Sequence, residues 1–159
     1  MEWDKVTDII LVTAFAVLGV LAMFGLYQWI SRKSLKAVDK SLTAFFPTLA
    51  VMTIIYLIFD KFLILSTRPD GSGKPSFPSS HTMVVGTIFF CTMLALPHYV
   101  KNKPLLIILD LIMLALIALT ATGRILANKH WPMDVACGLV FAAILAGLYY
   151  LISKKKEQK

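Results

Sequence analysis

Residues 104–122, PLLIILDLIMLALIALTAT, form an apolar run in which Asp110 is the one charged residue. A run of about 20 apolar residues is long enough for a helix to cross the hydrocarbon core of a bilayer. Four further runs share this character: Asp8 to Ile30, Ser41 to Leu65, Thr82 to Tyr99 and Pro132 to Ile152. Because a single spanning segment satisfies its backbone hydrogen bonds only as a helix, the sequence predicts an all-α, polytopic membrane bundle of about five transmembrane helices.

The composition agrees with a membrane protein. Hydrophobic residues make up 58% of the 159 residues, and the mean hydropathy is +0.76, whereas soluble domains contain roughly half apolar residues. No repeat or low-complexity linker divides the chain, so we expect residues 1–159 to form one integral membrane domain. Cys91 and Cys137 lie inside apolar runs without metal-ligand spacing, which favours buried free thiols. Asp110, inside the run quoted above, is interpreted as a packing or partner residue.

The distribution of basic residues predicts the orientation. Most of the 16 Lys and Arg residues lie in the first connection, in the turn at 97–104 and in the C-terminal tail. Because cytoplasmic loops are enriched in Lys and Arg, we expect these segments, with the C-terminus, on the cytoplasmic side of a cytoplasmic (inner) membrane. The N-terminus is then outside. This topology and contacts with membrane lipids account for much of the net charge of +7, so nucleic-acid binding is not indicated.

Polar side chains gather at two connections on the predicted outer side. The first, at 66–78, is rich in Gly, Pro and Ser and is followed by a helix start. The second, at 125–131, ends before Pro132, and proline suits the first position of a helix. Helix starts attract anions. The residues that meet at these connections are Lys61, Arg68, Ser79, Ser80, His81, Arg124, His130 and Asp134.

Each of these residues has an ordinary explanation when it is taken alone. A single Lys or Arg near a helix end usually extends to the lipid headgroups, a single His is more often structural, and Asp134 could cap a helix. Three cations, two histidines and a carboxylate on one side of so apolar a chain have no common structural reason, so a site is the better interpretation.

The chemistry that these residue types permit is phosphoryl transfer. Fixed cations hold the phosphate oxygens and offset the charge that spreads onto them in the transition state. A neutral histidine can attack phosphorus if its second ring nitrogen is held by an acceptor, as Asp134 could do four residues after His130. The other histidine can protonate the departing oxygen.

Three motifs make the sequence resemble the type 2 phosphatidic acid phosphatases, or lipid phosphate phosphatases, which share a core with vanadium haloperoxidases. The first family motif, Lys, six residues, Arg-Pro, matches at Lys61, Arg68 and Pro69. The second, Pro-Ser-Gly-His, matches at 78–81 with Ser80 in place of Gly. The third, Ser-Arg, five residues, His, three residues, Asp, matches at 123–134 with Gly123 in place of Ser. Three spaced motifs in order are far more specific than any one of them.

The resemblance implies a role for each matched residue. His130 would be the nucleophile that forms a phosphohistidine, Asp134 would orient it, and His81 would be the acid for the leaving group and then the base for water. The phosphate would be bound by Lys61, Arg68, Ser79, Ser80 and Arg124. The family uses no metal or other cofactor. Its core usually has six crossings, so the five expected here indicate a reduced form.

The sequence therefore predicts a metal-independent, membrane-embedded lipid phosphatase whose site is on the periplasmic or extracellular side. Four substrate types remain open: undecaprenyl diphosphate, phosphatidylglycerophosphate, phosphatidic acid and the phosphates of lipid A. Alternatives are a lipid phosphotransferase or a vanadate-dependent haloperoxidase with the same fold and, from another class, a small transporter. A transporter would be expected to place its coupling residues near the midplane on repeated halves, and this sequence shows neither feature. The oligomeric state is open.

Overall fold

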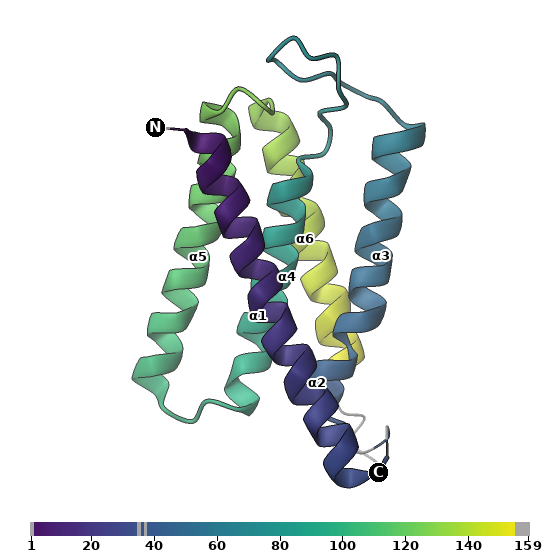
Figure 1. Cartoon of the computed structure of the whole chain (residues 1–159), viewed down its shortest axis with the longest axis vertical. Helices are drawn as coiled ribbons and strands as arrows, with labels where there is room; N and C mark the ends of the chain where they lie inside the picture. The colour runs from purple at the N-terminus through teal and green to yellow at the C-terminus, as the bar shows by residue number, and fades with distance from the viewer. Residues whose placement is uncertain (1, 35, 37, 155–159) are drawn as a thin grey trace.

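The computed structural model describes residues 2–34, 36 and 38–154. Long helices lie side by side and are joined at two ends of the molecule (Figure 1). One end holds the start of α1, the loop that precedes α4 and the turn between α5 and α6. The elements in chain order are α1 (Trp3–Arg32), α2 (Lys40–Thr43), α3 (Phe45–Leu57), the π-helical segment η2 (Ile58–Phe62), α4 (Ser80–Ala95), the 3-10 segment η3 (Leu96–His98), α5 (Lys103–Leu126) and α6 (Pro132–Ser153).

The prediction of an all-α bundle with five crossings is confirmed. Within residues 2–34, 36 and 38–154, five helical stretches are long and apolar enough to cross a membrane, and each overlaps one of the predicted runs, although the runs that end at Leu65 and Tyr99 extend past their helices. These stretches are Trp3–Arg32, Lys40–Phe62, Ser80–His98, Lys103–Leu126 and Pro132–Ser153. The described residues form no strand beyond an isolated bridge between Thr67 and Pro75 in the loop before α4.

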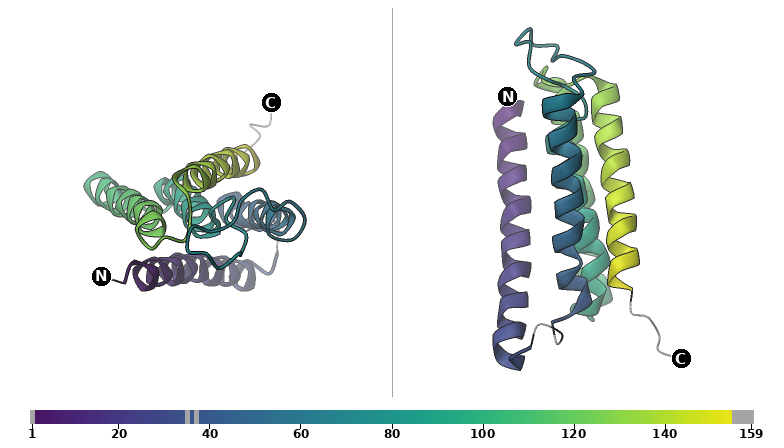
Figure 2. Two further views of the ribbon diagram at one scale, coloured as in Figure 1. Left: turned by 90° about the horizontal axis from the view of Figure 1, so that it is seen from above. Right: turned by 90° about the vertical axis from the view of Figure 1, so that its right-hand side faces the viewer.

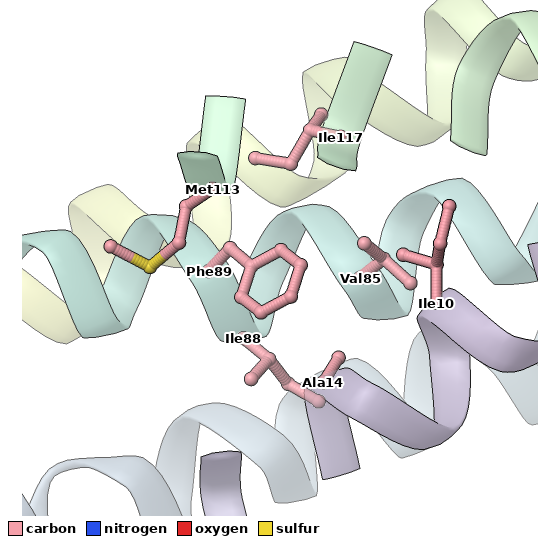
Figure 3. Packing of buried hydrophobic residues seen from close by; sticks show 7 residues of the cluster. All are labelled: Ile10, Ala14, Val85, Ile88, Phe89, Met113 and Ile117. Carbon is pink, nitrogen blue, oxygen red and sulfur yellow. The ribbon is translucent and has the colours of Figure 1, made fainter. Parts of the chain in front are cut away.

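The core of the bundle is built around α4. Seen from above, α4 lies among α1, α3, α5 and α6 (Figure 2). Figure 3 shows one packed cluster in which Ile10 and Ala14 of α1 and Met113 and Ile117 of α5 surround side chains of α4. The outer faces of the surrounding helices expose large apolar side chains, for example Phe46 and Ile107. Because these faces suit contact with lipid and α4 is shielded from it, α4 can carry polar residues at its start.

Two glycines allow the helices that hold the polar end to approach closely. A Cβ atom on Gly138 of α6 would lie 2.9 Å from the backbone oxygen of Ser79, at the start of α4. A Cβ atom on Gly123 of α5 would lie 2.6 Å from Cγ2 of Thr7 on α1. Both distances are shorter than real Cβ contacts, so a side chain at either position would push two helices apart. Gly138 therefore places the start of α6 against α4, and Gly123 places the end of α5 against α1.

The opposite end of the bundle is held by a polar network. Gln28 of α1 donates from Nε2 to Oδ2 of Asp39 at 2.9 Å, and Tyr99 donates from its hydroxyl to the same oxygen at 3.2 Å. Tyr149 of α6 donates to the backbone oxygen of Ser41 at 2.6 Å. These bonds tie α1, α2, η3 and α6 together, so the two ends of the bundle are fixed by separate sets of polar contacts.

Candidate active site

Segments from four parts of the chain meet at the polar end of the bundle. They are the start of α1, the loop at 63–79, the start of α4, and the turn from the end of α5 into α6 (Figure 1). Among the contacts that hold the loop over this end, the indole Nε1 of Trp131 donates to the backbone oxygen of Thr67 at 2.9 Å, and Lys129 pairs with Asp70 at 3.2 Å. The sequence motifs therefore lie on one end of the molecule, as expected.

His130 is buried, and one of its two ring nitrogens is free. Nδ1 lies 2.8 Å from the backbone oxygen of Ser76. A carbonyl only accepts, so the proton is on Nδ1 and Nε2 carries the lone pair. Nε2 is buried without a hydrogen-bond partner. Burial, and then the positive charges of Arg124 and Arg68, lower the pKa of His130 from 6.5 to about 4. The ring is therefore neutral near pH 7, with a lone pair available.

Asp134 acts on His130 through the loop. It accepts a hydrogen bond from the Ser76 hydroxyl, one from the Ser66 hydroxyl at 3.2 Å and one from the Trp131 backbone N–H at 3.0 Å. Its nearest carboxylate oxygen lies 4.0 Å from Nδ1 of His130. We expected Asp134 to hold that nitrogen itself, whereas in the structure the backbone oxygen of Ser76 holds it. The carboxylate fixes Ser76, and Ser76 fixes the ring.

Arg124 is buried and is paired with the first helix. Its Nη1 lies 2.7 Å from Oδ1 of Asp4, 3.3 Å from the hydroxyl of Thr7 and 3.9 Å from Oδ1 of Asp8. Its Nε is buried without a partner. Such an orphaned donor is costly unless a further group accepts from it. Arg124 thus keeps one N–H available while carboxylates of α1 balance its charge.

His81 also faces the first helix. Its Nε2 lies 2.9 Å from Oδ1 of Asp8, and the ring is about one-fifth exposed. The same Asp8 oxygen lies 3.9 Å from Nη1 of Arg124, so it stands beside both His81 and the buried arginine. Among the described residues, no bonded partner is found for Nδ1 of His81.

A small cavity at the polar end brings three of the expected residues together. Arg68, Ser80 and His130 all line it, and Arg68 is held in place by a bond from its Nε to the backbone oxygen of Pro75 at 3.3 Å. Tyr56, Phe59 and Phe77 form its aromatic wall, and Phe59 packs edge-on against Phe77 with ring centroids 5.3 Å apart. The cavity thus joins polar groups to an apolar wall.

Two expected phosphate ligands have other partners. Lys61 lies at the end of η2 with its side chain 66% exposed and is not among the residues that line the cavity, whereas Asp60, with which it pairs at 2.8 Å, does line it. Ser79 is fully buried and its hydroxyl shares a bond with that of Thr82 at 2.9 Å. Its backbone N–H donates to the backbone oxygen of Asp134 at 3.0 Å, which joins α4 to α6.

Three polar residues of this end were missed by the sequence reasoning. Asp4 and Asp8 lie four residues apart on one face of α1, and a carboxylate pair at that spacing on the side of the motifs was the available signal. Ser76 had no comparable signal, because its backbone oxygen contacts His130 and a backbone contact cannot be predicted from a pattern of residue types. Among the described residues, no group of three or more His, Cys, Asp or Glu side chains could hold a metal ion.

Comparison with known proteins agrees with the motifs. A sequence model described as the PAP2 superfamily matches residues 59–158. A protein named lipid A 1-phosphatase from Porphyromonas gingivalis is 34% identical over 86 residues. That alignment covers 54% of this chain and 18% of the relative, so the chain spans about a fifth of the relative's length. No solved structure matches the chain.

Proposed function

Because the chain belongs to the PAP2 superfamily, we propose that it is a membrane-embedded phosphatase that hydrolyses a lipid phosphate or diphosphate without a metal, through a phosphohistidine on His130. The observation that carries this proposal is a pair of buried, unpartnered polar atoms, Nε2 of His130 and Nε of Arg124. One is a lone pair that can attack phosphorus, and the other is a cationic donor that can bind a phosphate oxygen. Oδ1 of Asp110 is also buried without a hydrogen-bond partner, but Asp110 lies in the half of α5 near its start, away from the motifs.

The reaction proposed is a double displacement. The lone pair on Nε2 of His130 forms a bond to phosphorus while the bond between phosphorus and the lipid oxygen breaks, and the bonding electrons stay on that oxygen. Protonated His81 gives its proton to that oxygen. The lipid then leaves as an alcohol if the substrate is a monophosphate, or as a lipid monophosphate if it is a diphosphate. Neutral His81 then takes a proton from water, whose oxygen displaces His130 from phosphorus. Inorganic phosphate leaves, and His130 is neutral again.

The charge that develops on the phosphoryl oxygens would be balanced by fixed donors. Arg68 and Ser80 line the cavity beside His130, and Arg124 offers its free N–H. Planar guanidinium groups suit two phosphate oxygens at once. Lys61 and Ser79 are proposed as weaker or indirect contributors, since Lys61 is exposed and Ser79 is held by Thr82. Binding of substrate by Lys61 requires it to exchange Asp60 for phosphate.

A lipid substrate is supported by the surroundings of the cavity. Phe59 of its aromatic wall belongs to η2, and Phe62 of the same segment is 81% exposed. The relative named lipid A 1-phosphatase supports a lipid headgroup phosphate as the substrate class. We propose the phosphates of lipid A, undecaprenyl diphosphate, phosphatidylglycerophosphate and phosphatidic acid as candidates. The site would lie at the outer surface of the cytoplasmic membrane, with the N-terminus outside and the C-terminus in the cytoplasm.

We also propose that residues 1–159 act as one domain. α1 precedes the residues that the family model matches, yet it packs against α4 and α5 and supplies Asp4 to Arg124. Removal of α1 would take away the carboxylates that balance the charge of Arg124 together with part of the structure that covers it, and loss of the partner of a buried charge is strongly destabilising. The first helix is therefore proposed to belong to the working enzyme.

The test is a phosphate-release assay with the four lipids, in detergent and with a chelator present. We expect release of inorganic phosphate from at least one lipid by the wild type, and loss of more than about 99% of that activity in His130→Ala, since a missing nucleophile cannot be replaced by positioning alone. Transfer of the phosphoryl group to another lipid with no free phosphate contradicts hydrolysis. Turnover that requires a divalent metal contradicts the mechanism.

A further inference from the structure

We propose that Asp8 is a positioning residue for His81, so that the first helix supplies a carboxylate to the acid-base step of the reaction. The inference rests on the proposed function, and it concerns a residue outside the stretch that the family model matches. The observation is the 2.9 Å contact between Oδ1 of Asp8 and Nε2 of His81, across the interface between α1 and α4.

The contact determines which ring nitrogen of His81 can exchange a proton with the substrate. A carboxylate accepts hydrogen bonds only, so Nε2 of His81 carries a proton and donates it to Asp8. Nδ1 is then the nitrogen that exchanges a proton with the leaving group and with water. A carboxylate that holds one ring nitrogen fixes the orientation of the imidazole and stabilises the imidazolium form. Asp8 thus does for His81 what Ser76 does for His130.

The surrounding charges explain why a carboxylate is needed at this place. Oδ1 of Asp8 lies 2.9 Å from Nε2 of His81 and 3.9 Å from Nη1 of Arg124, so a carboxylate of α1 stands beside both the histidine and the buried arginine. An acid beside a buried arginine keeps its proton poorly unless an opposite charge is close. Asp4 lies 2.7 Å from Nη1 of Arg124, and Asp8 lies 3.9 Å from the same nitrogen. Asp4 therefore balances the charge of Arg124, and Asp8 is available to hold His81.

The competing interpretation is that Asp8 occupies the place of the substrate. Its carboxylate lies between two groups that could bind phosphate, His81 and Arg124. If it were a stand-in anion, phosphate would have to displace it, and its removal would favour substrate binding. If it positions His81, its removal slows the step in which the leaving group is protonated. The two interpretations predict opposite changes in kcat/KM.

The experiment compares Asp8→Asn, Asp8→Glu and Glu2→Gln in the full chain with two substrates. One is a lipid phosphate that the wild type hydrolyses, and the other is 4-nitrophenyl phosphate, whose phenolate leaves without a proton. Glu2→Gln is the matched control, because Glu2 is an exposed acid directly before α1 that pairs with Lys5.

For Asp8→Asn we expect kcat/KM to fall about tenfold with the lipid, a part of what general acid catalysis contributes, and to change less than about twofold with the nitrophenyl ester. Asp8→Glu should recover part of the loss, and Glu2→Gln should match the wild type. An equal loss with both substrates shows a structural role and overturns the inference, and a gain with both shows a competing anion and also overturns it. A wild type that releases no phosphate from any lipid overturns the proposed function and the inference together.

Discussion

Replacement of Gly138 by alanine should destabilise the bundle at the place where the site is built. The new Cβ atom would lie 2.9 Å from the backbone oxygen of Ser79 and 3.4 Å from the backbone nitrogen of Met83. Both are backbone atoms at the start of α4, so neither can rotate out of the way as a side chain can. Extra volume in a well-packed core costs about 1 to 3 kcal/mol, so α4 and α6 must separate or the helices must strain.

Gly147→Ala is the matched control, because it lies on the same helix and a Cβ atom there meets nothing within 4 Å. The change from Gly to Ala in a helix gains about 1 kcal/mol at either position, so the difference between the two variants isolates the steric cost. Gly138→Ala should therefore be about 1 to 3 kcal/mol less stable than Gly147→Ala, which is a difference in Tm of roughly 2 to 12 °C for a chain of this size.

The assay is thermal unfolding of both variants in the same detergent, followed by circular dichroism, with phosphate release measured at a temperature where both are folded. Gly138→Ala should also lose activity, because the bond from the Ser79 N–H to the Asp134 backbone oxygen crosses the same interface. If Gly138→Ala is as stable as Gly147→Ala, the close approach of α4 and α6 does not exist and the placement of His130 must be reconsidered.

Three further predictions follow from the site. With 4-nitrophenyl phosphate, whose leaving group needs no proton from His81, the single-turnover rate of phosphoryl transfer should stay level as the pH falls from 7 and should drop near pH 4, because burial lowers the pKa of His130 to about 4 and only the neutral ring attacks; a drop centred near pH 6.5 contradicts this. Gly123→Ser restores the hydroxyl of the resembled motif, yet it should lower both Tm and activity because its side chain collides with Thr7; a more active variant contradicts the structure. Lys61→Ala should raise KM less than Arg68→Ala does, since the Lys61 side chain is 66% exposed and lies outside the cavity lining; an equal or larger effect of Lys61→Ala shows that it reaches the substrate.

The fold could be predicted from the sequence because the bilayer imposes a simple rule. Each crossing needs about 20 apolar residues, and each predicted run overlaps one of the five helical stretches. Their ends were less predictable: α1 begins at Trp3, ahead of the predicted Asp8, because charged residues can continue a helix into the interface. Ser79 stands at the start of α4 as expected, but its hydroxyl bonds to Thr82 and does not cap the helix.

The site could be predicted in part. Motif spacing placed His130, Arg68 and Ser80 at one end, and the structure has them around one cavity. The i, i+4 spacing of His130 and Asp134 suggested a direct bond, but the intervening distance of 4.0 Å is bridged by Ser76. Such a relay depends on the path of the loop backbone, which residue types do not encode.

The contribution of the first helix could not be derived from the motifs either. Asp4 and Asp8 reach the site because α1 leans against α4 and α5, and that packing depends on the space left by Gly123. From the sequence alone, Gly123 is interpreted as the loss of the serine hydroxyl of the family motif. In the structure it is the reason that α1 can approach Arg124, so an apparent defect of the motif is a condition for the local charge balance.

The most direct test of the proposed mechanism is to find which residue carries the phosphoryl group during turnover. The enzyme is mixed with a lipid phosphate, quenched in alkaline denaturant after milliseconds, digested and analysed by mass spectrometry, with His130→Ala and His81→Ala in parallel. We expect one acid-labile phosphoryl group on His130 in the wild type, none in His130→Ala, and slower formation of the same group on His130 in His81→Ala. A phosphoryl group on His81, or turnover with no phosphoryl group on any residue, contradicts the mechanism.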